Sequence, residues 1–269
     1  MFATFKLDPQ SFSNGDFQEY YDEGKQMYDS HERIVSDSLN SYLLPGGALS
    51  ASEIEKNWFP EIKADVFLSH SHEDEKYAIA FAGFLKSLNL TAFVDSCVWG
   101  YANDLLKKID DKYCVSEKNS DDNINSYDYA KRNQSTAHVH MILNGALMKM
   151  INQTECLIFM DTPNSLATRD VIQGATNSGW IYSELLMSRY IERKSPYMEE
   201  PFQCRMDESL KHSELSVKYD VDISHLTRLS IGDIKEATNC DKNSGTDVLD
   251  QLYRTKKYIM ESNKCQRRR

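Results

Sequence analysis

Closely spaced cysteines, long apolar stretches and an excess of positive charge are all missing from this sequence. The six cysteines stand far apart with no Cys-x-x-Cys pair, which disfavours a disulfide framework or a zinc knuckle and favours reduced thiols. No run approaches the roughly 18 apolar residues of a membrane span, and no signal-peptide pattern opens the chain. The net charge of −10 argues against broad binding to nucleic acid, which needs clustered Lys and Arg. These absences predict a soluble, cytoplasmic protein.

Residues 64–95 alternate between strand-like and helix-like patterns. Residues 65–68 are a short apolar run with a β-branched and an aromatic side chain, and residues 91–94 form a second strand-like run. Between them, apolar residues recur at the i, i+3, i+4, i+7 spacing of a helix over 78–88. Strand, polar loop, helix and strand make one βαβ unit. Such a unit predicts two parallel strands, because parallel strands are joined by a crossover, usually a helix.

Polar residues stand where each of these two strands ends. Ser69 and His70 follow the first strand, and Asp95 follows the second. Parallel sheets place their ligand sites at the carboxyl ends of the strands. We therefore expect Ser69, His70 and Asp95 to share one edge of the sheet and to handle a nucleotide there.

The rest of the chain fits one α/β domain with additions at both ends. Residues 156–160 are a continuous apolar run, which is typical of a central parallel strand covered on both faces. We predict a flavodoxin-like, three-layer fold over 63–260, with a central parallel sheet of about five strands. Residues 1–62 are expected to form a mostly helical N-terminal extension packed on this domain. Residues 261–269 are expected to form a solvated basic tail.

The elements between the strands are predicted from apolar spacing and from turn residues. Residues 96–101 are expected to form a loop and residues 103–109 a short helix. A long polar loop, or an insertion with marginal helix, is predicted over 113–133. Helices are predicted over 135–151 and 180–190.

Four segments, in order, resemble the Toll/interleukin-1 receptor (TIR) domain family. Asp65-Val66-Phe67-Leu68-Ser69-His70-Ser71 resembles the first box of the family, and Ala92-Phe93-Val94-Asp95 resembles its second strand and terminal acid. Residues 157–165 resemble the strand before the helix that carries the enzymatic residue. Trp180-Ile181-Tyr182-Ser183-Glu184 matches the Trp-x-x-x-Glu pattern of the NAD⁺-cleaving branch. The preceding Asn57-Trp58-Phe59-Pro60 looks like the leader of bacterial stand-alone TIR proteins, some of which act in antiphage defence.

The resemblance implies an NAD⁺ glycohydrolase or ADP-ribosyl cyclase that releases nicotinamide. It assigns the catalytic role to Glu184, because a carboxylate near the ribose stabilises the positive charge that develops there. Trp99 lies in the region where the family's BB loop follows the second strand. The residues expected to bind substrate are Ser69, His70, Phe93, Asp95, Trp99 and Trp180.

The resemblance also implies how such a protein works with other molecules. TIR enzymes assemble through TIR–TIR contacts, in which the BB loop of one subunit completes the site of the next. The product can serve as a signal for a downstream effector, and it can be linear, cyclic or conjugated. NAD⁺ is then a substrate and no cofactor or metal is expected, since the leaving group already carries a positive charge. The alternative is a non-catalytic TIR module that acts as a scaffold.

Simpler interpretations exist for the same residues. A helix glutamate such as Glu184 is usually solvated, and an isolated tryptophan such as Trp180 usually packs in the core. The pairs His70-x-His72 and His138-x-His140 lack the further ligands of a metal site. The Ser, His and Asp at the strand ends lack the nucleophile-elbow pattern of a hydrolase.

Overall fold

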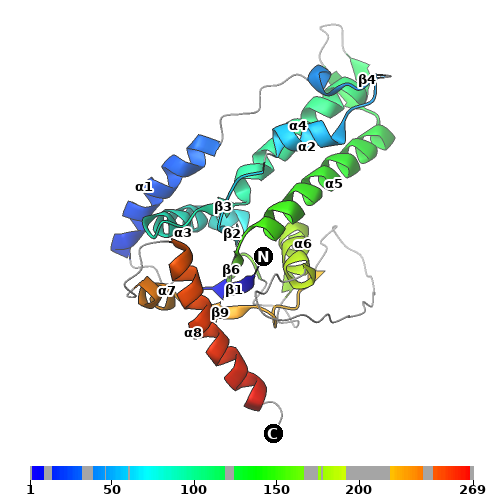
Figure 1. Ribbon diagram of the computed structural model, residues 1–269. Coiled ribbons are helices and arrows are strands. Elements are labelled where there is room, and N and C mark those ends of the chain that lie inside the picture. The colour runs from blue at the N-terminus through cyan, green and yellow to red at the C-terminus, as the bar shows by residue number, and fades with distance from the viewer. Residues whose placement is uncertain are drawn as a thin grey trace.

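The fold was examined in a computed structural model, which describes residues 2–8, 14–31, 39–45, 47–59, 61–118, 124–166, 175–176, 178–191, 219–238 and 245–266. Its centre is a five-stranded sheet with helices on both faces (Figure 1). In spatial order the strands are β3 (Ala92–Val94), β2 (Val66–Ser69), β6 (Cys156–Met160), β1 (Ala3–Leu7) and β9 (Thr227–Leu229). Every neighbouring pair is parallel. The flavodoxin-like α/β class predicted from the sequence is confirmed.

Helices and smaller sheets complete the described part of the chain. The helices are α1 (Asn14–His31), α2 (Ala51–Trp58), α3 (Glu75–Ser87), α4 (Ser96–Tyr113), α5 (Tyr129–Gln153), α6 (Gly179–Tyr190), α7 (Ile231–Thr238) and α8 (Gly245–Gln266). Two 3₁₀ segments are η2 (Leu39–Tyr42) and η3 (His72–Asp74). Two further sheets have two antiparallel strands each. In one, β4 (Val115–Lys118) pairs with β5 (Ile124–Tyr127), and in the other, β7 (Ala175–Thr176) pairs with β8 (Tyr219–Asp220).

The βαβ unit read from the sequence is present as β2, α3 and β3. Leu68 lies opposite Val94 in the parallel register of β2 and β3. The apolar run of β6 is completely buried between β2 and β1, as its continuous apolarity predicted. The apolar periodicity of these segments therefore predicted the part of the sheet in which β2 and β3 end.

Side chains alternate between the two faces of the sheet and fill two cores. Phe67 and Phe93 belong to the core under α2, α4, α5 and α6. Val66, Leu68 and Phe5 belong to the opposite core, under α3, α7 and α8. Burial of both faces explains why the strands read as continuous apolar runs.

The N-terminal region is more than the helical extension that was predicted. Residues 3–7 form β1, which lies inside the sheet with Phe5 opposite both Ile158 and Thr227. The polar Lys6 interrupts the apolar pattern of this short strand, and its ammonium group lies 3.7 Å from Asp161. The predicted domain boundary after residue 62 would therefore separate β1 from the sheet to which it belongs.

Helix α1 packs on α3, outside the sheet. Gly24 of α1 and Gly83 of α3 face each other at the crossing. A Cβ atom built on Gly83 would lie 1.9 Å from the carbonyl oxygen of Tyr20, and one on Gly24 would lie 1.9 Å from that of Ile79. Only glycine allows the two backbones to approach this closely.

Helices α4 and α5 run side by side away from the sheet, with α2 packed on them (Figure 1). We call α2, α4, α5 and the β4–β5 hairpin the helical arm. The predicted loop over 96–101 is wrong, because α4 begins at Ser96, directly after β3. For residues 113–133, the long loop is wrong, and the alternative of an insertion with some helix is closer to the structure. This segment contains the β4–β5 hairpin and the first turn of α5, where the Asp128 carboxylate accepts from the Lys131 backbone N–H.

Candidate functional site

Three of the predicted site residues meet at the carboxyl ends of β2 and β3. Ser69 is the last residue of β2, His70 follows it, and Asp95 follows the last residue of β3. Because Leu68 is paired with Val94, the next residues on the two parallel strands are neighbours. His70 Nδ1 lies 2.6 Å from Asp95 Oδ1, and both side chains are almost completely buried. The sequence prediction that these residues share one sheet edge is confirmed.

Glu184 reaches the same edge from α6. The Ser69 hydroxyl donates a hydrogen bond of 2.6 Å to Glu184 Oε2, across 115 positions of the sequence. Helix α6 is set in place by its Ser178 N-cap, which accepts from the Ile181 N–H, and by a 2.9 Å hydrogen bond from Ser183 Oγ to Asn144 Oδ1 of α5. Ser69, His70, Asp95 and Glu184 therefore form one cluster, which we call the buried quartet.

Burial and neighbouring charges shift the pKa values of two quartet residues. Glu184 is fully buried, and its pKa is raised well above 4.5 by desolvation, then by the negative charge of Asp95, against a smaller opposing effect of the Ser69 hydrogen bond. Burial alone lowers the pKa of His70, but the charge and hydrogen bond of Asp95 outweigh it, so this pKa is raised above 6.5. Both shifts favour the protonated form, so burial and the neighbouring Asp95 oppose ionisation of Glu184, and Asp95 favours the charged imidazole of His70.

The free energy of unfolding is expected to depend on pH because of these two raised pKa values. Both folded-state pKa values lie above the ordinary values of 4.5 and 6.5, so the folded state binds more protons than the unfolded state. The stability from Glu184 is complete below pH 4.5 and is lost as the pH rises through its folded pKa. The stability from His70 is complete below pH 6.5 and is lost in the same direction. Between its unfolded-state and folded-state pKa values, each group lowers the free energy of unfolding by up to about 1.4 kcal/mol for each unit that the pH rises.

Urea denaturation between pH 5 and pH 8 checks this expectation. Other carboxylates titrate at low pH, so the quantity to follow is the difference between Glu184→Gln and the wild type. The variant should gain stability relative to the wild type as the pH rises, because glutamine has no proton to lose. Parallel stability curves for the two proteins would show that Glu184 is ionised in the folded state.

The quartet is closed in this structure. The exposed fractions of Ser69, His70, Asp95 and Glu184 are 0%, 4%, 2% and 0%. No hydrogen bond between Ser69 and His70 is present among the described contacts, so the arrangement lacks the nucleophile–base pair of a serine hydrolase. What the geometry provides is a carboxyl group, a hydroxyl group and an imidazole at the carboxyl edge of a parallel sheet, where ligands bind in such folds.

The other predicted residues lie elsewhere or are only partly described. Phe93 is 3% exposed and packs on Phe67 with ring centroids 5.3 Å apart, and its contact with substrate stays a prediction. Trp180 is half-buried one turn before Glu184, and its ring meets His140 of α5 edge-on at 5.3 Å. Trp99 is in the first turns of α4 rather than in a loop, and its side chain lies outside the described residues.

A second polar cluster at this sheet edge was missed by the sequence reasoning. The buried carboxylate of Asp74, at the end of η3, accepts hydrogen bonds from Thr162 Oγ1 and from Asn164 Nδ2, the latter at 2.9 Å. Ser165 Oγ closes the same turn by donating to the Met160 carbonyl oxygen at 2.8 Å. The signal was available, since polar residues follow β6 as they follow β2 and β3. This cluster ties the β6 end to the start of α3 beside the quartet.

Comparisons with known proteins found no match for this chain. No protein-family model, curated protein or solved structure gives a significant match to it. The part of the chain that the structure describes contains no group of three or more His, Cys, Asp or Glu side chains that could hold a metal ion. None of the described helices combines the length and the apolar composition needed to cross a bilayer.

Proposed function

We propose that this chain is a TIR-like NAD⁺ nucleosidase, a glycohydrolase or an ADP-ribosyl cyclase, with Glu184 as its catalytic carboxyl group. The observation that supports this most strongly is the 2.6 Å hydrogen bond from Ser69 to Glu184, which joins α6 to the end of β2. The quartet supplies a carboxyl group and hydrogen-bonding groups of the kind that stabilise and hold a ribose as nicotinamide departs. Trp180, one turn away on α6, borders the proposed site.

The proposed reaction breaks the bond between C1′ of the ribose and the nicotinamide nitrogen. Nicotinamide leaves as a neutral molecule with the bonding electrons, and the ribose becomes oxocarbenium-like. Glu184, as a carboxylate, stabilises this positive charge, while Ser69 and His70 contact ribose or phosphate oxygens. Attack on C1′ by water, or by an acceptor group, releases one proton and gives a linear, cyclic or conjugated ADP-ribose product.

The burial of Glu184 bears on how such an enzyme would be controlled. A fully buried carboxyl group whose pKa is raised by desolvation is poorly placed to stabilise a cation. We therefore propose that the described arrangement is a resting state, and that TIR–TIR self-association opens the site and hydrates Glu184. The first turns of α4 stand where the family's BB loop would make such contacts. In bacterial antiphage defence within the cytoplasm, the product would then signal to an effector or the reaction would deplete NAD⁺.

The same burial favours a second candidate function. A TIR-like scaffold that acts only through self-association has no need of a solvent-accessible carboxylate. In that case the quartet is a buried polar network that fixes α6 on the sheet. The two functions differ in whether NAD⁺ is consumed.

Nicotinamide release separates the two candidates. Purified protein is incubated with NAD⁺ at increasing protein concentration, with and without a crowding agent, and nicotinamide and the ADP-ribose products are followed by chromatography and mass spectrometry. The nucleosidase is expected to release nicotinamide with a specific activity that rises with protein concentration. If NAD⁺ stays intact even where the protein is assembled, the scaffold is the correct function.

A further inference from the structure

A cavity of about 780 Å³ lies in the helical arm, away from the quartet. Its walls are the loop before α2, the start of α2, the last turns of α4 and one stripe of α5. Ligand sites for small molecules typically occupy about 300–1,000 Å³ and are mostly apolar with a few polar groups. The cavity has this size and this kind of lining, and nothing in the proposed nucleosidase activity uses it.

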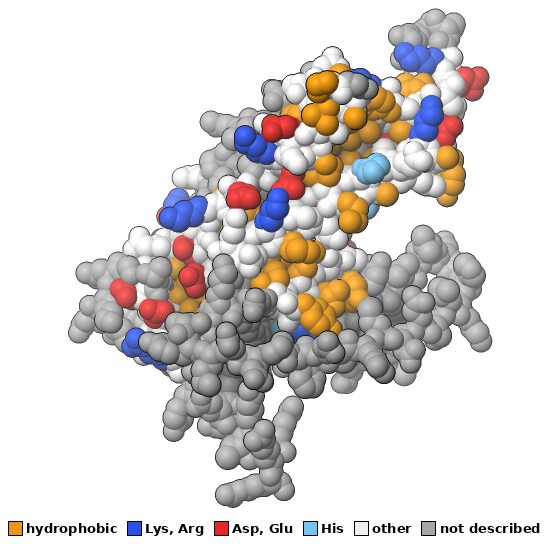
Figure 2. All heavy atoms as spheres, turned by 45° about the vertical axis from the view of Figure 1, so that its right-hand side comes forward, with side chains coloured by type: hydrophobic (Ala, Val, Ile, Leu, Met, Phe, Trp, Pro, Cys, Tyr) orange, Lys and Arg blue, Asp and Glu red, His pale blue; other side chains and the backbone are white. Residues whose placement is uncertain are grey.

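The lining is elongated and differs at its two ends. The α5 residues that line it run from Lys131 to Ile142, which is about 16 Å of helix at 1.5 Å per residue. Ile54, Met141 and Ile142 make one end apolar, while Lys131 and Gln134 lie at the other. Hydrophobic side chains also gather on the surface of the arm (Figure 2), and Met141 is 71% exposed.

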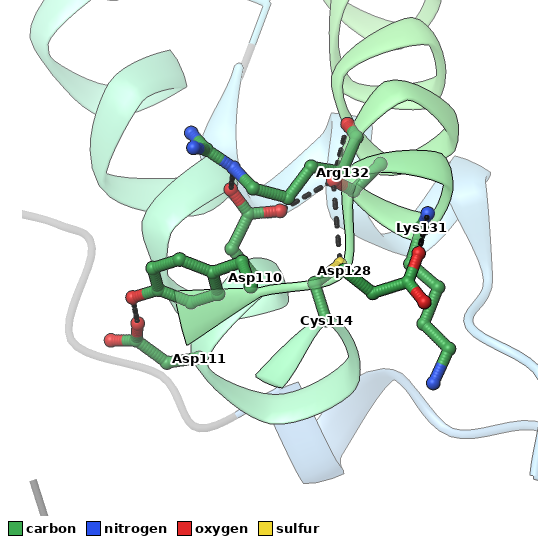
Figure 3. Close-up of polar contacts among 8 residues, drawn as sticks. Asp110, Asp111, Cys114, Asp128, Lys131 and Arg132 are labelled. Atoms are coloured by element: carbon green, nitrogen blue, oxygen red, sulfur yellow. Dashed lines mark hydrogen bonds and ion pairs between the residues drawn. The ribbon is translucent and has the colours of Figure 1, made fainter. Parts of the chain in front are cut away.

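Most charged groups around the polar end already have partners. Asp110 accepts from Ser135 Oγ and pairs with Arg132 Nε at 2.9 Å. Figure 3 shows this network, with Cys114 beside it and the side chain of Lys131 extending away from Asp110. Among the described residues, Lys131 has no carboxylate partner for its ammonium group.

The apolar end holds one further charged residue. Glu55 lines the cavity there and forms an ion pair with Lys149, so its charge is balanced within the protein. Lys131 is therefore the lining cation left to attract an anion. His138, between the two ends, offers a nitrogen for one more hydrogen bond.

We propose that this cavity binds an elongated amphiphile, an alkyl chain that ends in a single carboxylate. The apolar lining fits the chain, because burial of each CH₂ group contributes about 0.8 kcal/mol. The carboxylate would lie at Lys131. A nucleotide fits poorly, since a polyphosphate requires several cations and the lining supplies one.

Isothermal titration calorimetry with decanoate and the uncharged decanol tests the proposal on the full chain. One decanoate molecule per chain should bind to the wild type, and Ala48→Trp, which places an indole in the cavity, should abolish this binding. Ala137→Trp is the matched control, because Ala137 is an exposed α5 residue outside the lining, and it should bind as the wild type does. Circular dichroism establishes that both variants are folded.

The position of the carboxylate is tested by the difference between the two probes. Lys131→Gln should weaken decanoate binding about fivefold and leave decanol binding unchanged, while Lys107→Gln, an exposed lysine elsewhere on α4, should alter neither. Absence of saturable binding, or binding that survives Ala48→Trp, would overturn the proposal. A third outcome would also overturn the proposal: the wild type fails to bind decanoate but co-sediments with anionic lipid vesicles, and Met141→Ser abolishes this co-sedimentation. The helical arm would then be a membrane contact.

Discussion

Glu184→Gln is expected to lower NAD⁺ cleavage at least about 100-fold while the protein stays folded. Glutamine has nearly the shape of a protonated glutamic acid, so it can accept from Ser69 and present an N–H toward Asp95 in the same place. It cannot become a carboxylate, and the proposed role of Glu184 is to stabilise positive charge on the ribose. Loss of one such preorganised group from an active site typically costs about 10²–10³ in kcat.

Two measurements on the same samples make this result specific. Nicotinamide release gives the activity, and urea denaturation at pH 7 gives a free energy of unfolding equal to or above that of the wild type. Glu236→Gln, on the exposed side of α7, is the matched control and should change neither quantity. Full activity in Glu184→Gln would remove Glu184 from the mechanism even if the wild type cleaves NAD⁺.

His70→Ala is expected to destabilise the fold by about 3–5 kcal/mol. His70 and Asp95 are a buried ion pair with 2.6 Å between Nδ1 and Oδ1. Removal of the imidazole leaves the Asp95 carboxyl group buried without its counter-ion, and that is the costly outcome for a buried pair. Asp95→Asn together with His70→Ala should cost less than the sum of the two single changes, since neither side then carries an uncompensated charge.

The neighbouring histidine provides the control for this change. The side chain of His72 is 83% exposed, so His72→Ala should alter the free energy of unfolding by no more than about 0.5 kcal/mol. Equilibrium denaturation in urea at pH 7, followed by circular dichroism, compares these four variants, Asp95→Asn alone included, with the wild type. Equal losses for His70→Ala and His72→Ala would show that the buried pair contributes little.

The sequence was most informative where a local pattern and a topological rule act together. The spacing over 64–95 specifies strand, helix and strand, and parallel topology then requires Ser69, His70 and Asp95 to meet. The place of Glu184 could not be read from spacing, because it depends on where α6 packs more than 100 residues later. The TIR resemblance supplied it, and the structure brings its carboxyl group into hydrogen-bond contact with Ser69.

The features that the sequence did not reveal have physical causes. The direction of Phe93 could not be read from alternation of polar and apolar residues, because its three-residue strand is covered on both faces. Residues 96–101 contain Gly100 and a run of aromatic and β-branched side chains, which disfavour helix locally, yet α4 is held by its packing on α2 and α5. The cavity of the helical arm exists only because three segments distant in sequence enclose it.

The position of β1 in the sheet has a consequence for how the chain folds. Phe5 is synthesised well before its partners Ile158 and Thr227. In the usual doubly wound order the fourth strand in space is also late in the chain, whereas here β1 takes that place. Both neighbours of β1 in the sheet, β6 and β9, come from much later in the chain. The pairing of β1 is therefore long-range, of the kind that slows folding.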